Sequence, residues 1–231
     1  MNCTLCDSQL KKMADEYYFI CETCGAYVMD KKYYLGSSEE KNRYKEHNND
    51  VNDTGYQNFT SPITDSILKN HTKEQLGLDY GCGTGPVISK QLEAKGYKVK
   101  LYDPYFYPNQ GNLNHQFDYI FSCEVFEHFY NPKQEIEKLL SLLKPEGNLF
   151  IMTHLYNTEI DFKNWYYRKD PTHVFIYTKE TIAFIGKKFD LRIEILTDRL
   201  IIAKSRVGKG ESHPQASLRT VREPLDSYGS S

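Results

Sequence analysis

The segment Leu78-Asp79-Tyr80-Gly81-Cys82-Gly83-Thr84-Gly85-Pro86 decides the fold of this chain. Residues 75–80 predict a strand, three alternating glycines follow it, and residues 87–95 have the pattern of a helix. Glycines let the backbone turn sharply and let a ligand approach the main chain. The segment therefore predicts a strand, loop and helix with a ligand site at the carboxyl end of the strand.

Strands and helices alternate on both sides of this loop. Further strands are expected at 97–102, 118–123 and 148–153, and helices at 62–68, 133–143 and 178–187. Residues 189–196 and 199–204 predict an antiparallel hairpin. This alternation favours the α/β class, with a Rossmann-like, doubly wound, mostly parallel sheet and an antiparallel C-terminal hairpin.

The glycine loop departs from the fingerprint of dinucleotide-binding proteins. Pro86 stands where the last glycine of G-x-G-x-x-G is expected, and Asp79 places a carboxylate just ahead of the loop. That carboxylate repels a pyrophosphate but suits a ligand with an amino group or a sulfonium. A nicotinamide-dependent oxidoreductase is therefore disfavoured.

Four cysteines near the N-terminus form two C-x2-C pairs separated by fourteen residues. Two such pairs are typical of a tetrahedral zinc site with four thiolates, and a redox pair is the alternative. Gly25 can adopt the left-handed conformation that such a turn needs. We interpret residues 1–34 as a zinc ribbon whose metal is structural, because four thiolates leave no open position. The predicted ligands are Cys3, Cys6, Cys21 and Cys24.

Composition narrows the remaining classes of protein. The chain has 231 residues, 39% of them hydrophobic, with a formal net charge of −2. This is a globular composition without an apolar run of transmembrane length or a signal peptide, so we expect a cytoplasmic protein without membrane contact. The charge does not favour a nucleic-acid partner. We expect a connector of helix and loop over 35–59, the main domain over 60–205, and a flexible tail over 206–231, interpreted as native or vector-derived.

Several motifs, in order, resemble class I S-adenosylmethionine (SAM)-dependent methyltransferases. Besides the glycine loop, they are Asp103 after the second strand, L-L-K-P-E-G-N-L at 142–149 and D-P-T-H-V at 170–174. F-D-Y-I-F-S-C-E-V-F-E-H at 117–128 is similar to the ubiquinone-biosynthesis-like subgroup. The resemblance covers residues 60–204. Only thirteen residues, 104–116, separate the second strand from the next motif, so the usual helix and third strand must be shortened.

The resemblance implies a SAM site. The glycine loop would hold the methionine end, Asp103 the ribose hydroxyls, and Glu124 the methionine or adenosine part. Simpler alternatives are a loop cap for Asp79, a turn residue for Asp103 and a surface charge for Glu124. Cys82 and Cys123 are also expected as small packing residues. The implied cofactor residues are Asp79, Gly81, Gly83, Gly85, Asp103, Cys123 and Glu124.

Histidines near the predicted strand ends are candidates for a general base, since histidine titrates near neutrality. We place His173 first and His128 second, with a structural hydrogen bond as the alternative for each. His47 and Tyr56 are read as solvated loop residues, with a lid over the cofactor as the alternative. Aromatic residues at 162–167 predict either a substrate wall or a packed cover over the sheet.

Together these patterns predict a SAM-dependent methyltransferase that acts on an unidentified small molecule at an O, N or C atom. Two alternatives remain: a ribosomal-RNA methyltransferase that binds its substrate through the zinc ribbon, and a non-catalytic module that binds SAM or a nucleotide.

Overall fold

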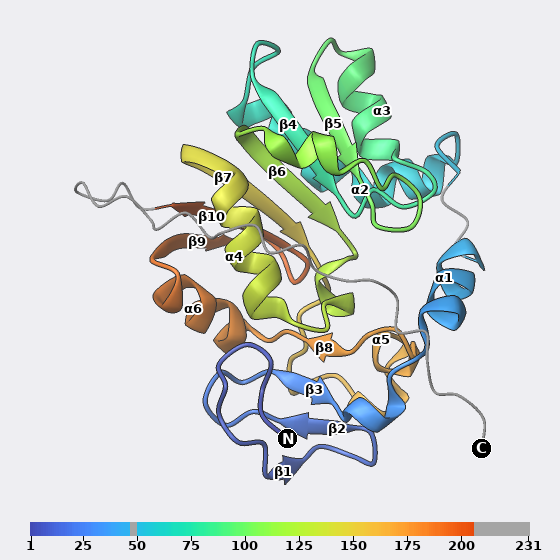
Figure 1. Ribbon diagram of the computed structural model, residues 1–231, viewed down its shortest axis with the longest axis vertical. Coiled ribbons are helices and arrows are strands. Elements are labelled where there is room, and N and C mark those ends of the chain that lie inside the picture. Colours follow the sequence, from blue (N-terminus) through green and yellow to red (C-terminus); the bar gives the residue numbers. More distant parts are fainter. Residues whose placement is uncertain (47–49, 206–231) are drawn as a thin grey trace, which may run out of the picture.

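The chain forms a six-stranded sheet with helices on both faces and a small four-stranded sheet below it (Figure 1). The computed structural model describes residues 1–46 and 50–205. The large sheet has the order β5-β4-β6-β7-β10-β9, in which the first four strands are parallel and β10 is antiparallel to β7. The predicted fold class, including the antiparallel C-terminal hairpin of β9 and β10, is confirmed. Its strands are β4 (Leu76–Tyr80), β5 (Lys98–Tyr102), β6 (Phe117–Cys123), β7 (Leu143–Met152), β9 (Leu191–Ile195) and β10 (Leu200–Ser205).

Alternating side chains of the strands supply a core on each face of the large sheet. On one face, Tyr119 and Phe121 pack with apolar residues of α2 and α3. On the other, Leu149 and Ile151 pack with those of α4 and α6. Because both faces are covered, the strands are buried and apolar, as expected of a doubly wound sheet. The helices are α2 (Thr54–Asn70), α3 (Val87–Ala94), α4 (Pro132–Leu142) and α6 (Lys179–Lys188).

The helix expected at 62–68 is longer than predicted. It begins at Thr54, where the Asp53 carboxylate accepts a hydrogen bond from the Tyr56 amide, and Pro62 lies inside it. The Ser61 hydroxyl donates to the Asn58 carbonyl one turn earlier, the oxygen that the missing Pro62 N–H leaves without a helical donor. A proline is thus tolerated inside a helix that was predicted to begin at that residue.

The segment after β5 is as short as expected. Residues 103–116 contain the 3-10 helix η2 (Gln110–Asn114), and no strand lies between β5 and β6 in this fully described stretch. β5 is therefore the edge of the large sheet, next to β4. Beside the start of β6, β7 begins at Leu143, opposite Phe117, and the register between the two strands shifts before Tyr119 pairs with Asn148.

The N-terminal residues form a small antiparallel sheet that is completed by a strand from much later in the sequence. β1 (Lys12–Met13), β2 (Tyr18–Ile20) and β3 (Tyr27–Met29) follow one another, and β3 pairs with β8 (Phe175–Ile176). Strand β8 lies far along the chain, between α5 (Tyr166–Lys169) and α6. The first 34 residues thus share a sheet with the rest of the molecule (Figure 1). Short 3-10 turns complete the description: η1 (Lys31–Tyr33), η3 (Phe126–His128) and η4 (Phe162–Asn164).

Helix α1 (Ser37–Glu46) lies within the predicted connector. It lies beside α5, at the level between the two sheets (Figure 1). Among the helices of the described part of the chain, none has the length and apolar composition needed to cross a lipid bilayer. The predicted tail at 206–231 lies outside the described residues.

Candidate cofactor and acceptor site

The glycine loop leaves the carboxyl end of β4 and crosses toward β5. Gly81 and Gly83 have φ angles of +81° and +60°, a conformation that residues with a Cβ rarely adopt. The Gly81 amide donates to the Tyr102 carbonyl at 2.8 Å. A Cβ on Gly81 would lie 2.5 Å from Cγ2 of Val125, so the loop also contacts the segment after β6. The predicted strand, loop and helix are therefore present at the carboxyl ends of three neighbouring strands.

Asp79 points into the protein beneath this loop. Its carboxylate is 4% exposed and accepts a 2.6 Å hydrogen bond from the Ser89 hydroxyl of α3. Burial raises its pKa to about 7, the Ser89 hydrogen bond opposes that rise, and the nearby Asp103 adds to it. A cation above the loop would favour the ionised form.

Asp103 follows β5 and reaches back to the glycine loop. Its Oδ2 accepts from the Gly83 amide at 3.1 Å, and its Oδ1 accepts from the amides of Tyr105 and Phe106. The carboxylate therefore acts as the turn residue that the sequence allowed, and it also lies against the glycine loop. Both oxygens are held by main-chain donors, so their positions are fixed.

Cys123 and Glu124 end β6 on the same side of the sheet. The Glu124 amide donates to the Met152 carbonyl at 2.8 Å, and its Oε1 lies 3.5 Å from Nη1 of Arg199. Burial raises the pKa of Glu124, Glu127 raises it further, and Arg199 opposes both. Burial likewise raises the pKa of the Cys123 thiol, which therefore packs as a neutral group. These two residues and the glycine loop lie at the carboxyl ends of neighbouring strands, β6 and β4.

The two candidate histidines lie together, from segments 45 residues apart. Their rings are 4.8 Å apart between centroids in an edge-to-face arrangement. Nδ1 of His128 is 3.0 Å from the Thr172 carbonyl oxygen, and Nδ1 of His173 is 2.7 Å from that of Tyr167. Both rings thus make the structural hydrogen bonds considered as the alternative. In each neutral ring Nε2 keeps the lone pair, because a carbonyl can only accept.

Helix α1 covers this side of the molecule with polar and aromatic side chains. Buried Glu40 accepts hydrogen bonds from the hydroxyls of Tyr44 at 2.6 Å and Tyr105 at 2.8 Å. The Tyr44 ring meets the His128 ring edge-on, with centroids 5.1 Å apart. Sequence analysis did not predict this contact, although Glu40 and Tyr44 are four residues apart and so share a helix face.

The aromatic stretch at 162–167 is mostly buried and does not form an open wall for a substrate. Phe162, Trp165 and Tyr167 are buried, and only Tyr166 is well exposed, so the packed-cover interpretation of the aromatic stretch holds for three of its four residues. Tyr56 lies in helix α2 rather than in a loop, and burial raises its pKa. His47 lies outside the described residues.

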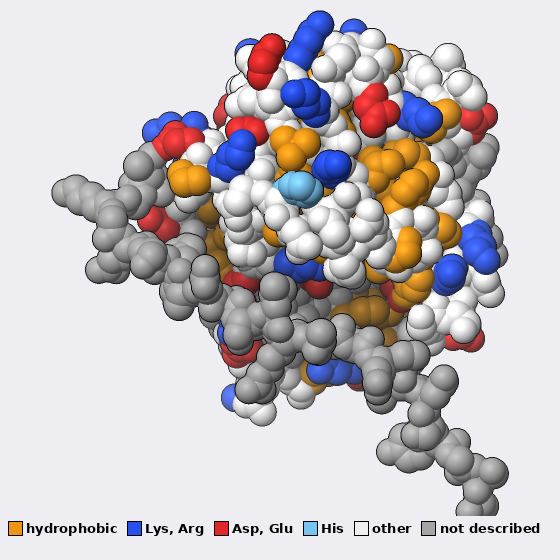
Figure 2. Space-filling view, turned by 45° about the horizontal axis from the view of Figure 1, so that its top comes forward, with side chains coloured by type: hydrophobic (Ala, Val, Ile, Leu, Met, Phe, Trp, Pro, Cys, Tyr) orange, Lys and Arg blue, Asp and Glu red, His pale blue; other side chains and the backbone are white. Residues whose placement is uncertain are grey.

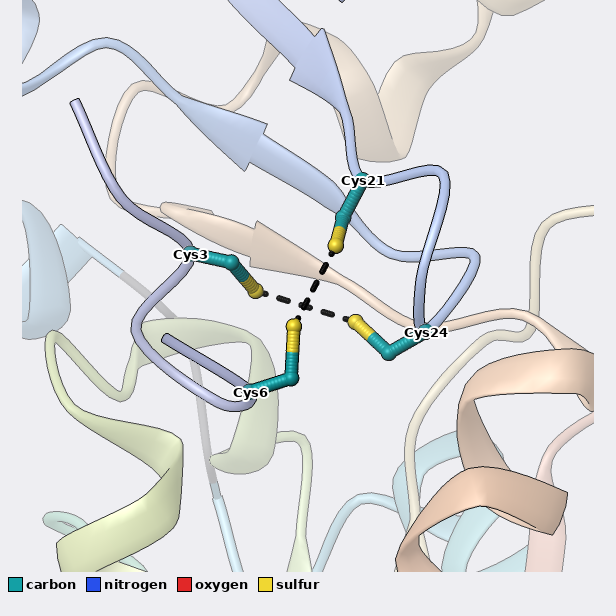
Figure 3. A group of neighbouring side chains, drawn as sticks. All are labelled: Cys3, Cys6, Cys21 and Cys24. Carbon is teal, nitrogen blue, oxygen red and sulfur yellow. Dashed lines mark hydrogen bonds between the residues drawn. The ribbon is translucent and has the colours of Figure 1, made fainter. Parts of the chain in front are cut away.

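The four N-terminal cysteines converge on one point (Figure 3). Their sulfur atoms all lie within 4.8 Å of one another, with Cys3 and Cys24 at 3.7 Å and Cys6 and Cys21 at 3.4 Å. A zinc ion with bonds of about 2.3 Å in a tetrahedron places its sulfur ligands about 3.8 Å apart. The four residues therefore fit such an ion.

The two cysteine turns are built alike. The residue after each pair has a left-handed backbone, with φ of +64° and +75°, and its amide donates to the carbonyl of the first cysteine. Gly25 fills this position in the second turn as predicted. Asp7 fills it in the first, which the sequence did not indicate because aspartate is only occasionally left-handed. The Cys24 thiol, as hydrogen-bond partner, lowers the pKa of Cys3 to about 5, so this pair already favours one thiolate.

Lysine and arginine side chains alternate with acidic ones on the face shown in Figure 2. They do not gather into one basic patch on this face. A protein that binds RNA through phosphate contacts usually presents such a patch. This face therefore gives no support to the RNA-binding alternative.

Comparison with known proteins identifies one sequence family. The profile described as "Methyltransferase domain" matches residues 54–195, more than half of the chain. No curated protein matches the chain in sequence.

Several solved structures share the fold at low sequence identity. The 1,6-didemethyltoxoflavin-N1-methyltransferase of Burkholderia thailandensis, with bound 1,6-didemethyltoxoflavin and S-adenosylhomocysteine, is 12% identical with a TM-score of 0.53. The match covers 85% of this chain and 99% of that one. Human N-acetylserotonin methyltransferase in complex with SAM is 13% identical with a TM-score of 0.50, over 74% of this chain and 56% of that one. At such identities these likenesses show the fold.

Proposed function

Because the chain belongs to the methyltransferase-domain family, we propose that it transfers the methyl group of SAM to a small-molecule acceptor. The family match and the predicted enzyme class agree. The observation that carries the proposal is the contact between the glycine loop and Asp103, at the carboxyl ends of β4 and β5. The Burkholderia and human structures, which share the fold, hold SAM or its product. The substrate named for the first of them is a small molecule, which supports the same class of acceptor here.

SAM fits this site with its methionine end over the loop and its ribose on Asp103. The loop exposes main-chain groups because Gly81, Gly83 and Gly85 lack side chains. Asp79 beneath it favours a ligand that carries an ammonium and a sulfonium rather than a pyrophosphate. Cys123 and Glu124 adjoin the same space and would line the adenosine or the methionine. Methyl transfer itself needs orientation and exclusion of water more than covalent help from the protein.

The test of this placement is the SAM affinity of Asp103→Ala, measured by calorimetry. Loss of a charged acceptor for the ribose hydroxyls should weaken binding about tenfold to a hundredfold, from about 1.5–3 kcal/mol. Asp65→Ala, at an exposed position on α2, is the matched control and should bind as wild type does. Unchanged affinity in a folded Asp103→Ala protein would remove this residue from the site.

We also propose that His128 and His173 face the acceptor. His128 contacts the Tyr44 ring of the covering helix, and the segment that carries it begins at Val125, against Gly81. An Nε2 lone pair in this place can accept a proton from the acceptor. As a general base either histidine would contribute about 10²–10⁴ in turnover. A turnover loss of this size in His128→Gln or His173→Gln, at unchanged SAM affinity, supports the role, and normal turnover contradicts it.

The cysteine cluster is proposed to hold one zinc ion with a structural role. Four thiolates fill the tetrahedron, so no position remains for a substrate. All four are free thiols in the structure, and thiolates persist in a reducing compartment. We therefore also propose the cytoplasm as the location.

A further inference from the structure

A second group of possible metal ligands includes the two histidines that are proposed to face the acceptor. Glu127, His128 and His173 place one ligand atom each within 4.8 Å of one another. Glu127 and His128 belong to the turn η3, and His173 to the loop before β8. The sequence analysis singled out both histidines but not Glu127. The group is distinct from the cysteine cluster and from the glycine loop.

The two histidines use the same ring nitrogen, Nδ1, for a hydrogen bond to a main-chain carbonyl. Each Nδ1 donates to a main-chain carbonyl, of Thr172 for His128 and of Tyr167 for His173. Histidines that bind metal through Nε2 usually donate the other ring N–H to a carbonyl or a carboxylate, which fixes the tautomer and the ring orientation. The arrangement is therefore the one that ligand histidines have.

Glu127 supplies a buried carboxylate with one oxygen unsatisfied. The residue is 0% exposed, and its Oε2 accepts from the Thr153 hydroxyl at 2.8 Å. Within residues 1–46 and 50–205, its Oε1 has no hydrogen-bond partner. Nε2 of His128 is 3.8 Å from this oxygen, which is too long for a hydrogen bond. A buried carboxylate without a compensating partner is destabilising, so a positive charge at this point would stabilise it.

We propose that Glu127, His128 and His173 bind a divalent transition-metal cation of the Mn²⁺, Fe²⁺, Co²⁺ or Zn²⁺ class. Two imidazole nitrogens and one carboxylate oxygen suit these ions, whereas Mg²⁺ and Ca²⁺ prefer oxygen ligands alone. With bonds of about 2.1 Å, neighbouring ligands on a tetrahedral ion lie about 3.4 Å apart, so atoms now within 4.8 Å of one another need to approach by up to about 1.4 Å. Three protein ligands leave coordination positions open to an outside oxygen.

The site uses the same histidines as the proposed proton acceptance, and the two roles exclude each other. An imidazole nitrogen bound to a metal has no lone pair left for a proton. Cation binding can be measured without SAM or acceptor, so its test is independent of the test of methyl transfer. A confirmed site would make His128 and His173 ligands and would leave the proposed methyl transfer in place.

The experiment is a Mn²⁺ titration of protein loaded with one equivalent of zinc, followed by the electron paramagnetic resonance of free Mn²⁺. The thiolates of the cysteine cluster retain zinc, because soft ligands select it over Mn²⁺. We expect one Mn²⁺ per chain in wild type. Glu127→Gln keeps the size and an acceptor for Thr153 but loses the charge, and it should weaken binding at least tenfold. The control His115→Gln, at an exposed position, should bind as wild type does.

His173→Gln and His128→Gln should weaken Mn²⁺ binding as Glu127→Gln does. Zinc content and far-ultraviolet circular dichroism report whether each variant is folded. His128 is the most exposed of the three ligands, so its variant keeps the test open if the buried substitutions unfold the protein. Absence of stoichiometric Mn²⁺ in the wild type overturns the proposal. Equal affinity in wild type and a folded ligand variant does the same.

Discussion

The cysteine cluster and the glycine loop are both built on left-handed turns, but they use those turns in opposite ways. In the cysteine unit, Asp7 and Gly25 turn the chain so that four side chains meet. In the loop, Gly81 and Gly83 turn the chain so that the main chain stays uncovered. One site depends on side chains that are present, and the other on side chains that are missing. Substitutions should therefore act by loss of a ligand in the first region and by gain of volume in the second.

The largest effect is expected from Cys21→Ser in the cysteine unit. A structural zinc site with four thiolates contributes apparent binding free energies of about 10–16 kcal/mol in small zinc-binding peptides, and a unit of this size has little core of its own. The variant should lose zinc and local order at residues 1–34. Zinc analysis and amide hydrogen exchange of the N-terminal sheet measure both.

Cys123→Ser is the matched control for zinc, since Cys123 lies at the end of β6, in a different element. It should retain one zinc per chain. If wild type purified under reducing conditions contains no zinc and all four N-terminal thiols react freely, the cluster is not a metal site.

A smaller effect, of opposite origin, is expected from Gly81→Ala. The added Cβ would lie 2.5 Å from Val125, and the left-handed backbone costs roughly 1–2 kcal/mol more. We expect a loss of about 2–4 kcal/mol in the free energy of unfolding, together with weaker SAM binding. Denaturant unfolding measures the first and calorimetry the second.

Gly85→Ala is the control within the same loop, because it carries neither of the two costs. Gly85 does not have a positive φ, and an added Cβ would meet no heavy atom of the described residues within 4 Å. Its unfolding free energy should stay within about 0.5 kcal/mol of wild type. A Gly81→Ala protein as stable as Gly85→Ala would show that the loop does not need an uncovered main chain.

The smallest effect is a pH dependence that comes from Asp79. Burial raises its pKa to about 7, so the ionised form that suits a cationic ligand is present mainly above this value. SAM affinity should therefore rise by up to roughly tenfold from pH 6 to pH 8. Calorimetry across this range should give a flat profile for Asp79→Asn.

The unliganded protein should respond to pH in the opposite direction. A carboxyl whose folded pKa is raised binds more protons in the folded state than in the unfolded state. Its contribution to stability is therefore lost as pH rises from about 4 through about 7. Equal pH profiles of unfolding for wild type and Asp79→Asn would contradict the role of the buried carboxylate.

The parts of the fold that local patterns encode were predictable. Strand β4, the glycine loop and helix α3 follow one another within twenty residues, and each has its own signal in periodicity or glycine content. The cysteine cluster is similar, because each C-x2-C pair is one turn. The prediction that a helix starts at Pro62 was wrong, because the helix begins at Thr54. The Ser61 hydroxyl donates to the Asn58 carbonyl in place of the missing Pro62 N–H, a compensation that general rules for proline omit.

The region around His128 and His173 was less predictable, because segments far apart in the sequence meet there. Glu40 meets Tyr105 across 65 residues, and no periodicity links them. In the motif E-V-F-E-H, the sequence favours Glu124 and His128 as site residues, yet Glu127 is the fully buried residue. The short 3-10 turn at 126–128 turns that side chain inward, and a three-residue turn leaves no repeating pattern in the sequence.

The pairing of β3 with β8 has a consequence for any shortened form of the protein. Val28 is opposite Phe175, and Tyr27 is opposite Ile176, across two antiparallel strands that begin about 150 residues apart. Phe175 and Ile176 are fully buried. Removal of the first 34 residues would uncover them on a strand with unpaired main-chain groups, which is a template for association between chains. A cut that the sequence suggests as a domain boundary would therefore produce an aggregation-prone surface rather than an independent catalytic unit.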